Sequence, residues 1–148
     1  MITGFNHTSF TVQNLERALC FWTEGLGFKT ASVSERTGDW QARVTGVPAA
    51  RLKIAHLFGH GHHVEFIEYL EAVGCTLALE PNMAGVAHVC LEVDNIVSTV
   101  ATLMALGATG QGELVDVESG PVRCCRAIYI REPNGVIIEL VQLPNEIK

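Results

Sequence analysis

Apolar and polar residues alternate in short runs along most of the chain, which is the pattern of half-buried β-strands. In the first half, these runs predict strands over residues 5–12, 29–34, 40–44, 52–58 and 63–70. In the second half, they predict strands over residues 86–93, 112–117, 123–130 and 136–142. Glycine, proline and asparagine separate the runs, and Glu-Pro-Asn-Gly at 132–135 has the order of a tight turn.

Two longer segments have the three-to-four-residue apolar spacing of a helix. The first is expected over residues 15–24, with Asn14 as its N-cap and with Gly25 and Gly27 ending it. The second is expected to begin at a cap formed by Asp94 or Asn95 and to run to about residue 106, before Gly107. Each predicted helix directly follows a predicted strand.

The order of these elements repeats along the chain. His7 and His88 lie at matching points of matching predicted strands, and Glu65 lies within an apolar strand as Glu139 does. The repeat predicts an α+β fold made of tandem β-α-β-β-β modules that form a curved mixed sheet around a shared metal-binding cleft. At 148 residues we expect a single domain of two repeats, about 1–72 and 85–148, joined by a linker over 73–84.

The repeated histidines and carboxylates are ligands that Zn²⁺, Ni²⁺, Co²⁺, Mn²⁺ and Fe²⁺ accept. A carboxylate inside an apolar strand is costly to bury unless it is paired or bound to a metal. Taken singly, each residue also has a plainer explanation, as a half-buried histidine or a solvent-facing glutamate. Because all four recur together, the sequence predicts one divalent transition-metal centre with His7, Glu65, His88 and Glu139 as ligands.

Composition limits the partners that the protein is expected to have. A net charge of −6 and a pI near 5.4 leave little basic surface for nucleic acid. No apolar run is long enough to span a membrane, and no secretory signal opens the chain, so we expect a cytoplasmic protein. We expect the five cysteines to be reduced and mostly buried, with the adjacent Cys124 and Cys125 on opposite faces of a strand. Sheet edges that need covering favour a homodimer.

Several segments of the chain resemble a known family. They are Leu-Gly-Phe at 26–28, Gly-Val-Ala-His-Val-Cys-Leu-Glu-Val-Asp-Asn-Ile at 85–96, the turn at 132–135 and Ile-Glu-Leu at 138–140. In their order, spacing and duplication these segments are similar to the vicinal oxygen chelate superfamily, which includes glyoxalase I, methylmalonyl-CoA epimerase, extradiol dioxygenases and the bleomycin- and fosfomycin-resistance proteins. The resemblance implies paired modules that hold a divalent metal on the concave face of the sheet.

The resemblance also implies a type of reaction. A set of two histidines and two glutamates is similar to that of glyoxalase I and the epimerase, which implies an isomerase, epimerase or lyase. In such an enzyme the metal would stabilise an enolate of a small oxygenated or thioester substrate. A site of His7, His88 and Glu139 alone would instead resemble an Fe(II) extradiol-type dioxygenase. A non-catalytic, resistance-type binding protein for small molecules is a third interpretation.

The general base is not fixed by the resemblance. The epimerase family has a carboxylate where this chain has Lys53 or Ile54, so methylmalonyl-CoA is a doubtful substrate. Glu65 or Glu139 could act as the base, or His56 could, although a histidine at the edge of the core is an equally good reading of His56.

Three further residues are candidates for substrate binding. Tyr129 lies near the position of a substrate-binding tyrosine in extradiol dioxygenases, Trp40 could form a wall of the pocket, and Arg126 could bind a carboxylate or phosphate, as Arg123 or Arg131 could. Each also has an ordinary structural explanation, as a packed tyrosine, an exposed tryptophan or surface arginines. His60, His62 and His63 are expected to lie in a solvated loop.

Overall fold

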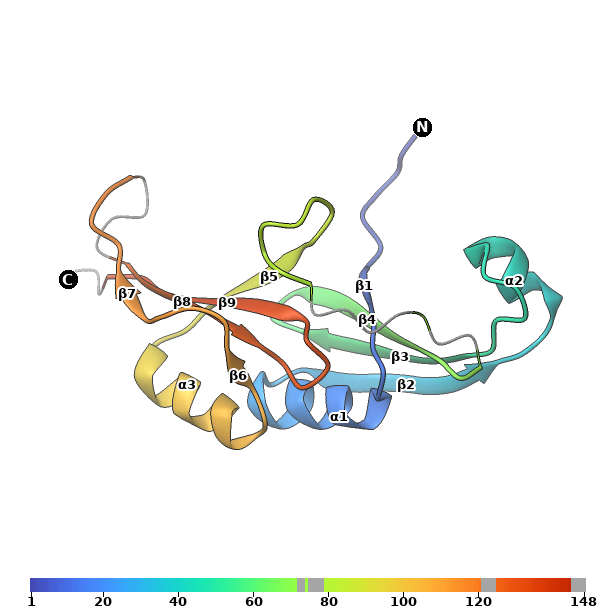
Figure 1. Cartoon of the computed structure of the whole chain (residues 1–148), viewed down its shortest axis with the longest axis horizontal. Coiled ribbons are helices and arrows are strands. Elements are labelled where there is room, and N and C mark those ends of the chain that lie inside the picture. The colour runs from blue at the N-terminus through green and yellow to red at the C-terminus, as the bar shows by residue number, and fades with distance from the viewer. Residues whose placement is uncertain (72–73, 75–78, 121–124, 145–148) are drawn as a thin grey trace. The chain divides into compact units, whose positions relative to one another are not determined.

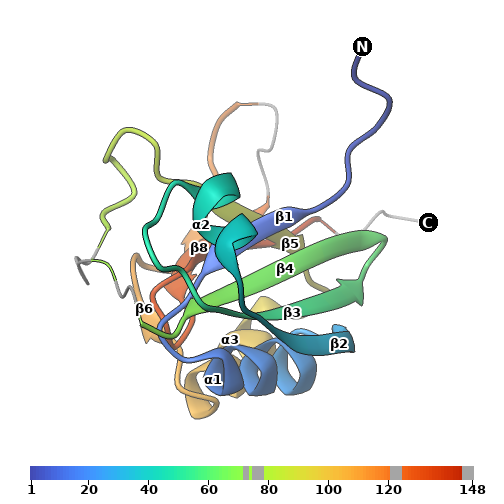
Figure 2. The same ribbon diagram turned by 90° about the vertical axis from the view of Figure 1, so that its right-hand side faces the viewer.

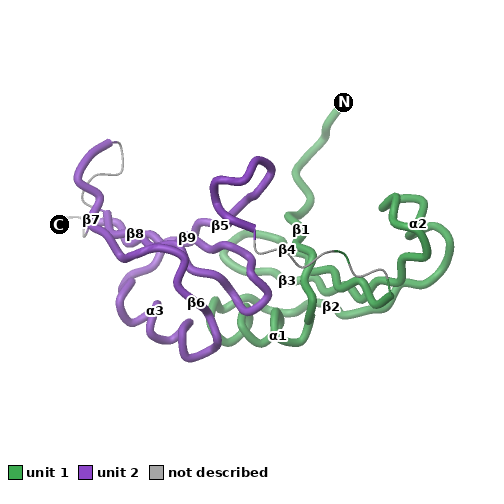
Figure 3. Tube along the Cα trace, viewed as in Figure 1, with its two compact units in different colours: residues 1–76 green, residues 77–148 purple. Residues whose placement is uncertain are grey.

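The computed structural model describes residues 1–71, 74, 79–120 and 125–144, and its elements are labelled in Figure 1. The chain divides into two compact units, residues 1–76 and residues 77–148 (Figure 3). Each unit contains one mixed sheet and at least one helix, so the predicted α+β class is confirmed. No helix in the described part of the chain is long and apolar enough to cross a membrane.

The first unit forms a four-stranded sheet in the order β1-β4-β3-β2. The strands are β1 (Thr8–Thr11), β2 (Lys29–Arg36), β3 (Leu52–Gly59) and β4 (His62–Tyr69). β1 runs parallel to β4, while β3 is antiparallel to both of its neighbours. This pairing confirms the predicted strands 29–34, 52–58 and 63–70 to within one or two residues at each end.

The first helix begins where the sequence predicts it. α1 (Leu15–Cys20) starts at Asn14, whose side chain accepts a hydrogen bond from the backbone N–H of Arg17. Its last turn widens into the π-helical turn η1 (Phe21–Gly25). The apolar face of this helix is buried against the sheet, with Trp22 and Phe66 in edge-to-face contact at 5.1 Å between ring centroids.

The predicted strand 40–44 is wrong. The segment forms α2 (Asp39–Thr45), which ends at Gly46 in the left-handed conformation, with the Gly46 N–H donating to the carbonyl of Ala42. The alternation that suggested a strand is misleading because the buried residue is the polar Gln41, while Trp40 and Val44 are exposed. Figure 2 shows α1 below the sheet of this unit and α2 above it.

The second unit repeats this plan with a sheet in the order β5-β9-β8-β6, and β7 also pairs with β8. Its elements are β5 (His88–Glu92), α3 (Ile96–Ala105), β6 (Thr109–Gly110), β7 (Val115–Asp116), β8 (Arg126–Arg131) and β9 (Ile137–Gln142). Asn95 caps α3 by accepting from the N–H of Ser98. The predicted turn is confirmed, because the Gly135 N–H donates to the carbonyl of Glu132.

Two other expectations need correction, and a third concerns residues that the structure does not describe. The strand predicted over 112–117 is replaced by the short strands β6 and β7. Two of the three described cysteines, Cys20 and Cys90, are exposed and only Cys125 is buried, so the expectation of mostly buried thiols is wrong for this part of the chain. Arg123, Cys124 and much of the predicted linker 73–84 lie outside the described residues.

Candidate metal centre

In the first unit, His7 and Glu65 lie next to each other at one edge of the sheet. His7 directly precedes β1, and Glu65 of β4 is the register partner of Ser9. The Nε2 atom of His7 is 3.4 Å from Oε1 of Glu65, and the Glu65 side chain is only 12% exposed. Nδ1 of His7 lies 2.7 Å from Oδ1 of Asn6, which can accept a hydrogen bond from Nδ1–H. In that tautomer Nε2 carries a lone pair.

In the second unit, His88 and Glu139 are arranged in the same way. His88 begins β5, and Glu139 of β9 is the register partner of Cys90. The Nε2 atom of His88 is 3.1 Å from Oε2 of Glu139. The residues on either side of Glu139, Ile138 and Leu140, are fully buried on the opposite face of the sheet. Strand alternation therefore places the carboxylate on the face away from the core.

The spacing within each pair fits two ligands of one metal ion. Atoms that each lie ~2.1 Å from a metal are roughly 3.0 Å apart in octahedral geometry and about 3.4 Å apart in tetrahedral geometry. The nitrogen–oxygen distances of 3.4 Å and 3.1 Å in the two units lie in this range. Within the described residues, no group of three or more His, Cys, Asp and Glu side chains is arranged to hold a metal. Each unit thus supplies one matched pair of ligand-type side chains.

His56 lies on the same face as Glu65. It is the direct register partner of Glu65 across β3 and β4, and its Nε2 atom is 3.7 Å from Oε2 of the carboxylate. Its other nitrogen, Nδ1, is 3.1 Å from Nε2 of His63, whose ring stacks on Phe58. The two oxygens of Glu65 therefore face two different histidines. His63, which was expected from the sequence both as a loop residue and as the first residue of the predicted strand 63–70, belongs to β4. Counting by twos from Glu65 along that strand would have placed it on this face.

Tyr129 occupies the corresponding position in the second unit. It is the register partner of Glu139 across β8 and β9, and its hydroxyl lies 3.3 Å from Nε2 of His88. Burial, together with the negative charge of Glu139, raises the pKa of the Tyr129 hydroxyl above its usual value, so the group is protonated at neutral pH. The residue can therefore donate a hydrogen bond or a proton in this site.

Cys90 is the register partner of Glu139 on the side away from Tyr129, and it was not among the residues singled out from the sequence. Its position two residues after His88 on a predicted strand would have placed it on the same face as His88. Burial, and then the charge of Glu139, raise the pKa of its thiol to about 11. The thiol is therefore neutral near pH 7 and can donate a hydrogen bond to the carboxylate. The register partner of Glu65 in the first unit is Ser9, a residue of similar size.

The remaining predicted site residues lie elsewhere. Trp40 is on α2 with 55% of its surface exposed. Arg126 has the opposite strand parity to Tyr129, and its guanidinium is 3.4 Å from a carboxylate oxygen of Asp116. Trp40 belongs to the first unit, and Arg126 has the opposite strand parity to Tyr129, so neither residue joins Tyr129 and Glu139 within the second unit. Their roles in binding substrate stay predictions.

Fold and site together define a protein of two similar modules, each with a histidine and a glutamate side by side on the exposed face of its sheet. Residues 4–140 match the model of the Glyoxalase/Bleomycin resistance protein/Dioxygenase superfamily, and the chain belongs to this family. The resemblance noted in the sequence is thereby confirmed.

The chain is also similar to three known proteins. A 2-epi-5-epi-valiolone epimerase from an Actinomyces species is 29% identical over 94% of this chain and 79% of its own length. A glyoxalase family protein from Bacillus cereus has a similar crystal structure, with a TM-score of 0.81 and 26% identity over 97% of this chain and 95% of that one. A variant of the fosfomycin resistance protein FosX from Listeria monocytogenes, solved with Mn(II) and 1S,2S-dihydroxypropylphosphonic acid, shares the fold at 17% identity. Its TM-score is 0.64, over 95% of this chain and 90% of that one.

Proposed function

We propose that the protein is a divalent-metal-dependent isomerase, epimerase or lyase that moves a proton at a carbon next to a carbonyl or thioester group. One observation carries the proposal: both units present a histidine nitrogen and a glutamate oxygen at a spacing that fits two ligands of one ion. His7, Glu65, His88 and Glu139 would hold the ion together. The relative named as an epimerase favours proton transfer over other chemistry of the family.

The metal would supply Lewis acidity, which lowers the pKa of the carbon acid beside the substrate oxygen. The chain itself must supply the groups that remove and return the proton. His56 is suited to remove it: when its Nδ1–H donates to Nε2 of His63, its own Nε2 carries a lone pair. This nitrogen lies on the same face as Glu65, where a substrate would be held.

Tyr129 is suited to return the proton. Its raised pKa keeps the hydroxyl protonated, and its position in the second unit matches that of His56 in the first. An epimerase needs two such groups, because the proton leaves one face of the carbon and arrives on the other. We assign the acceptor to His56 and the donor to Tyr129.

The second candidate is an Fe(II) extradiol-type dioxygenase that uses His7, His88 and Glu139. It is favoured by the Tyr129 hydroxyl, which lies 3.3 Å from His88 and could bind a substrate there. The two functions differ in what they require of Glu65. The isomerase needs this carboxylate as a ligand, whereas the dioxygenase does not.

The substitution Glu65→Ala separates them. We expect it to lower metal occupancy and to abolish deuterium incorporation from D₂O into 2-epi-5-epi-valiolone, the compound in the relative's name, or into related cyclic ketones. Glu68→Ala is the matched control, because Glu68 lies on the opposite face of the same strand, where Oε2 accepts from the N–H of Leu15. If Glu65→Ala instead leaves Fe(II)-dependent O₂ consumption within about tenfold of the wild-type rate, ~1.4 kcal/mol, the isomerase proposal is wrong.

A further inference from the structure

Arg131 lies on the same face of the second sheet as Tyr129. The two residues are two positions apart on β8, so strand alternation places their side chains on one face, about 7 Å apart along the strand. Arg131 is the register partner of Ile137, which in turn pairs with His88. A group bound by Arg131 would therefore lie two strand positions, or about 7 Å, from Tyr129 and Glu139.

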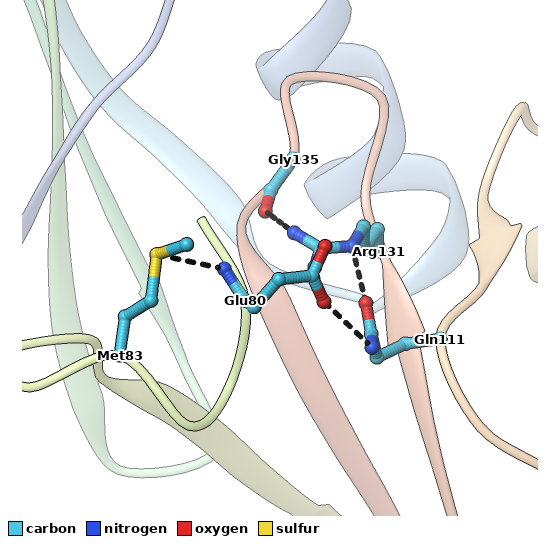
Figure 4. Close-up of polar contacts among 5 residues, drawn as sticks. All are labelled: Glu80, Met83, Gln111, Arg131 and Gly135. Atoms are coloured by element: carbon cyan, nitrogen blue, oxygen red, sulfur yellow. Dashed lines mark hydrogen bonds and ion pairs between the residues drawn. The ribbon is translucent and has the colours of Figure 1, made fainter. Parts of the chain in front are cut away.

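The guanidinium of Arg131 is held in a fixed orientation (Figure 4). Its Nε donates to Oε1 of Gln111 at 2.5 Å, and its NH1 donates to the carbonyl of Gly135 at 3.4 Å. The backbone N–H of Gln111 donates to the carbonyl of Tyr129, which ties this support to the predicted site. The side chain is only 14% exposed. An arginine held in this way has already lost much of the freedom that binding an anion would otherwise cost.

Two donors then meet at a single oxygen atom. NH2 of Arg131 and Nε2 of Gln111 both donate to Oε2 of Glu80, each at 3.3 Å. One oxygen of one carboxylate thus occupies a niche formed by a charged donor and a neutral donor from separate segments. We refer to this arrangement of Arg131 and Gln111 as the oxyanion niche.

Glu80 reaches the niche from a short loop of the same unit. The loop closes on itself by two turns, in which the N–H of Met83 donates to the carbonyl of Glu80 and the N–H of Val86 donates to the carbonyl of Met83. The N–H of Glu80 also contacts the sulfur of Met83 at 3.4 Å (Figure 4). The Glu80 side chain is 49% exposed. A half-exposed ion pair contributes little to stability, so a competing anion can displace it at small cost.

We propose that the oxyanion niche binds a carboxylate or phosphate group of the substrate and that Glu80 fills it in the absence of substrate. This proposal rests on the proposed isomerase function, because the bound anion is part of a substrate only if the protein is such an enzyme. It assigns anion binding to Arg131 rather than to Arg126, because Arg131 shares the face of β8 with Tyr129 whereas Arg126 has the opposite strand parity. It also predicts that the substrate carries an anionic group a few bonds away from the reacting carbon, as a phosphorylated cyclic ketone would, whereas 2-epi-5-epi-valiolone itself is neutral.

Calorimetric titration with inorganic phosphate tests the niche without any turnover. The protein is first freed of metal with a chelator, so that phosphate cannot bind to an ion and the result does not depend on the proposed function. Glu80→Ala should bind phosphate about fivefold more tightly than wild type, which is the gain expected from removing a competing pair of ~1 kcal/mol. Glu113→Ala, which removes an exposed carboxylate elsewhere in the unit, should leave phosphate binding unchanged.

Arg131→Gln should abolish saturable phosphate binding, and Gln111→Ala should weaken it. Gln111→Ala also serves as the test if Arg131→Gln does not fold by circular dichroism. A parallel titration with acetate shows whether the niche prefers a carboxylate. The proposal is overturned if Glu80→Ala shows no saturable phosphate binding or binds phosphate no better than Glu113→Ala. It is also overturned if Arg131→Gln or, where that variant is unfolded, Gln111→Ala binds phosphate as tightly as the wild type does.

Discussion

The two units place the same pair of residues at the same point of their sheets and surround it differently. Glu65 and Glu139 each lie on the inner strand beside an edge strand, and a histidine lies directly before that edge strand (His7) or at its first position (His88). Across the next strand, however, Glu65 faces His56 whereas Glu139 faces Tyr129. On the edge strand, Glu65 faces Ser9 whereas Glu139 faces Cys90. The two units thus carry the same ligand-type residues with different residues beside them. Under the proposed function, this difference would supply two different proton-transfer groups.

The largest effect should come from replacing the two residues that differ between the units, His56 and Tyr129. His56→Gln should lower kcat for deuterium exchange by about a hundredfold or more, because a positioned general base contributes on the order of 10²–10⁴. Tyr129→Phe should lower it by a similar factor, because phenylalanine has no proton to return and a positioned general acid contributes on the same order. His62→Gln is the control for the first variant, since His62 is exposed and lies at the end of the same hairpin. Equal losses for His62→Gln and His56→Gln would remove His56 from the mechanism.

The second unit has the thiol of Cys90 where the first unit has Ser9, and this thiol should titrate at high pH. In metal-free protein the rate of Cys90 alkylation should rise with a midpoint near pH 11, because burial and Glu139 raise the pKa of the thiol to about 11 from 9.0. Because the folded-state pKa is the higher one, the neutral thiol stabilises the fold fully below pH 9, and this contribution is lost as the pH rises toward 11. Glu139→Gln should move the midpoint down. Mass spectrometry of the Cys90 peptide measures it, and a midpoint at or below 9 in the wild type would contradict the described environment.

The smallest effect should come from a feature that the two units share. Asn14 and Asn95 each accept a hydrogen bond from the N–H three residues on, so Asn14→Ala and Asn95→Ala should each lower the free energy of unfolding by about 1 kcal/mol. Urea denaturation measures both changes. A cost that differs by more than about twofold between the two caps would show that the helices are not equivalent in stability.

The sequence was sufficient to predict the parts that the duplication repeats. The two helices, the Asn14 cap and most strands follow from local patterns that occur twice, and so does the presence of one histidine and one glutamate at matching points of each half. For the second helix the sequence left the cap open between Asp94 and Asn95, and the structure assigns it to Asn95. Because a strand alternates its side chains, the facing of Glu65 and Glu68 in opposite directions was also predictable, and Glu68 does bind the start of α1.

The rest depends on contacts that no local pattern contains. α2 was missed because its buried position is the polar Gln41, whose amide atoms have no hydrogen-bond partner in the described part of the chain. Cys90 and Tyr129 meet at Glu139 only through the pairing of three strands. The ion pair of Glu80 with Arg131 joins residues 51 positions apart, and its carboxylate comes from a segment that the sequence marked only as a linker.

The central claim is that the two histidine–glutamate pairs serve one metal ion, and the stoichiometry of binding tests it most directly. Equilibrium dialysis against Mn(II) or Zn(II), followed by elemental analysis, should give one ion per chain for the wild type. Glu65→Ala and Glu139→Ala should each reduce occupancy strongly at the same free metal concentration, because each removes a ligand of the same ion. Two ions per wild-type chain, with one retained after either substitution, would show that each unit binds its own ion and would contradict the account.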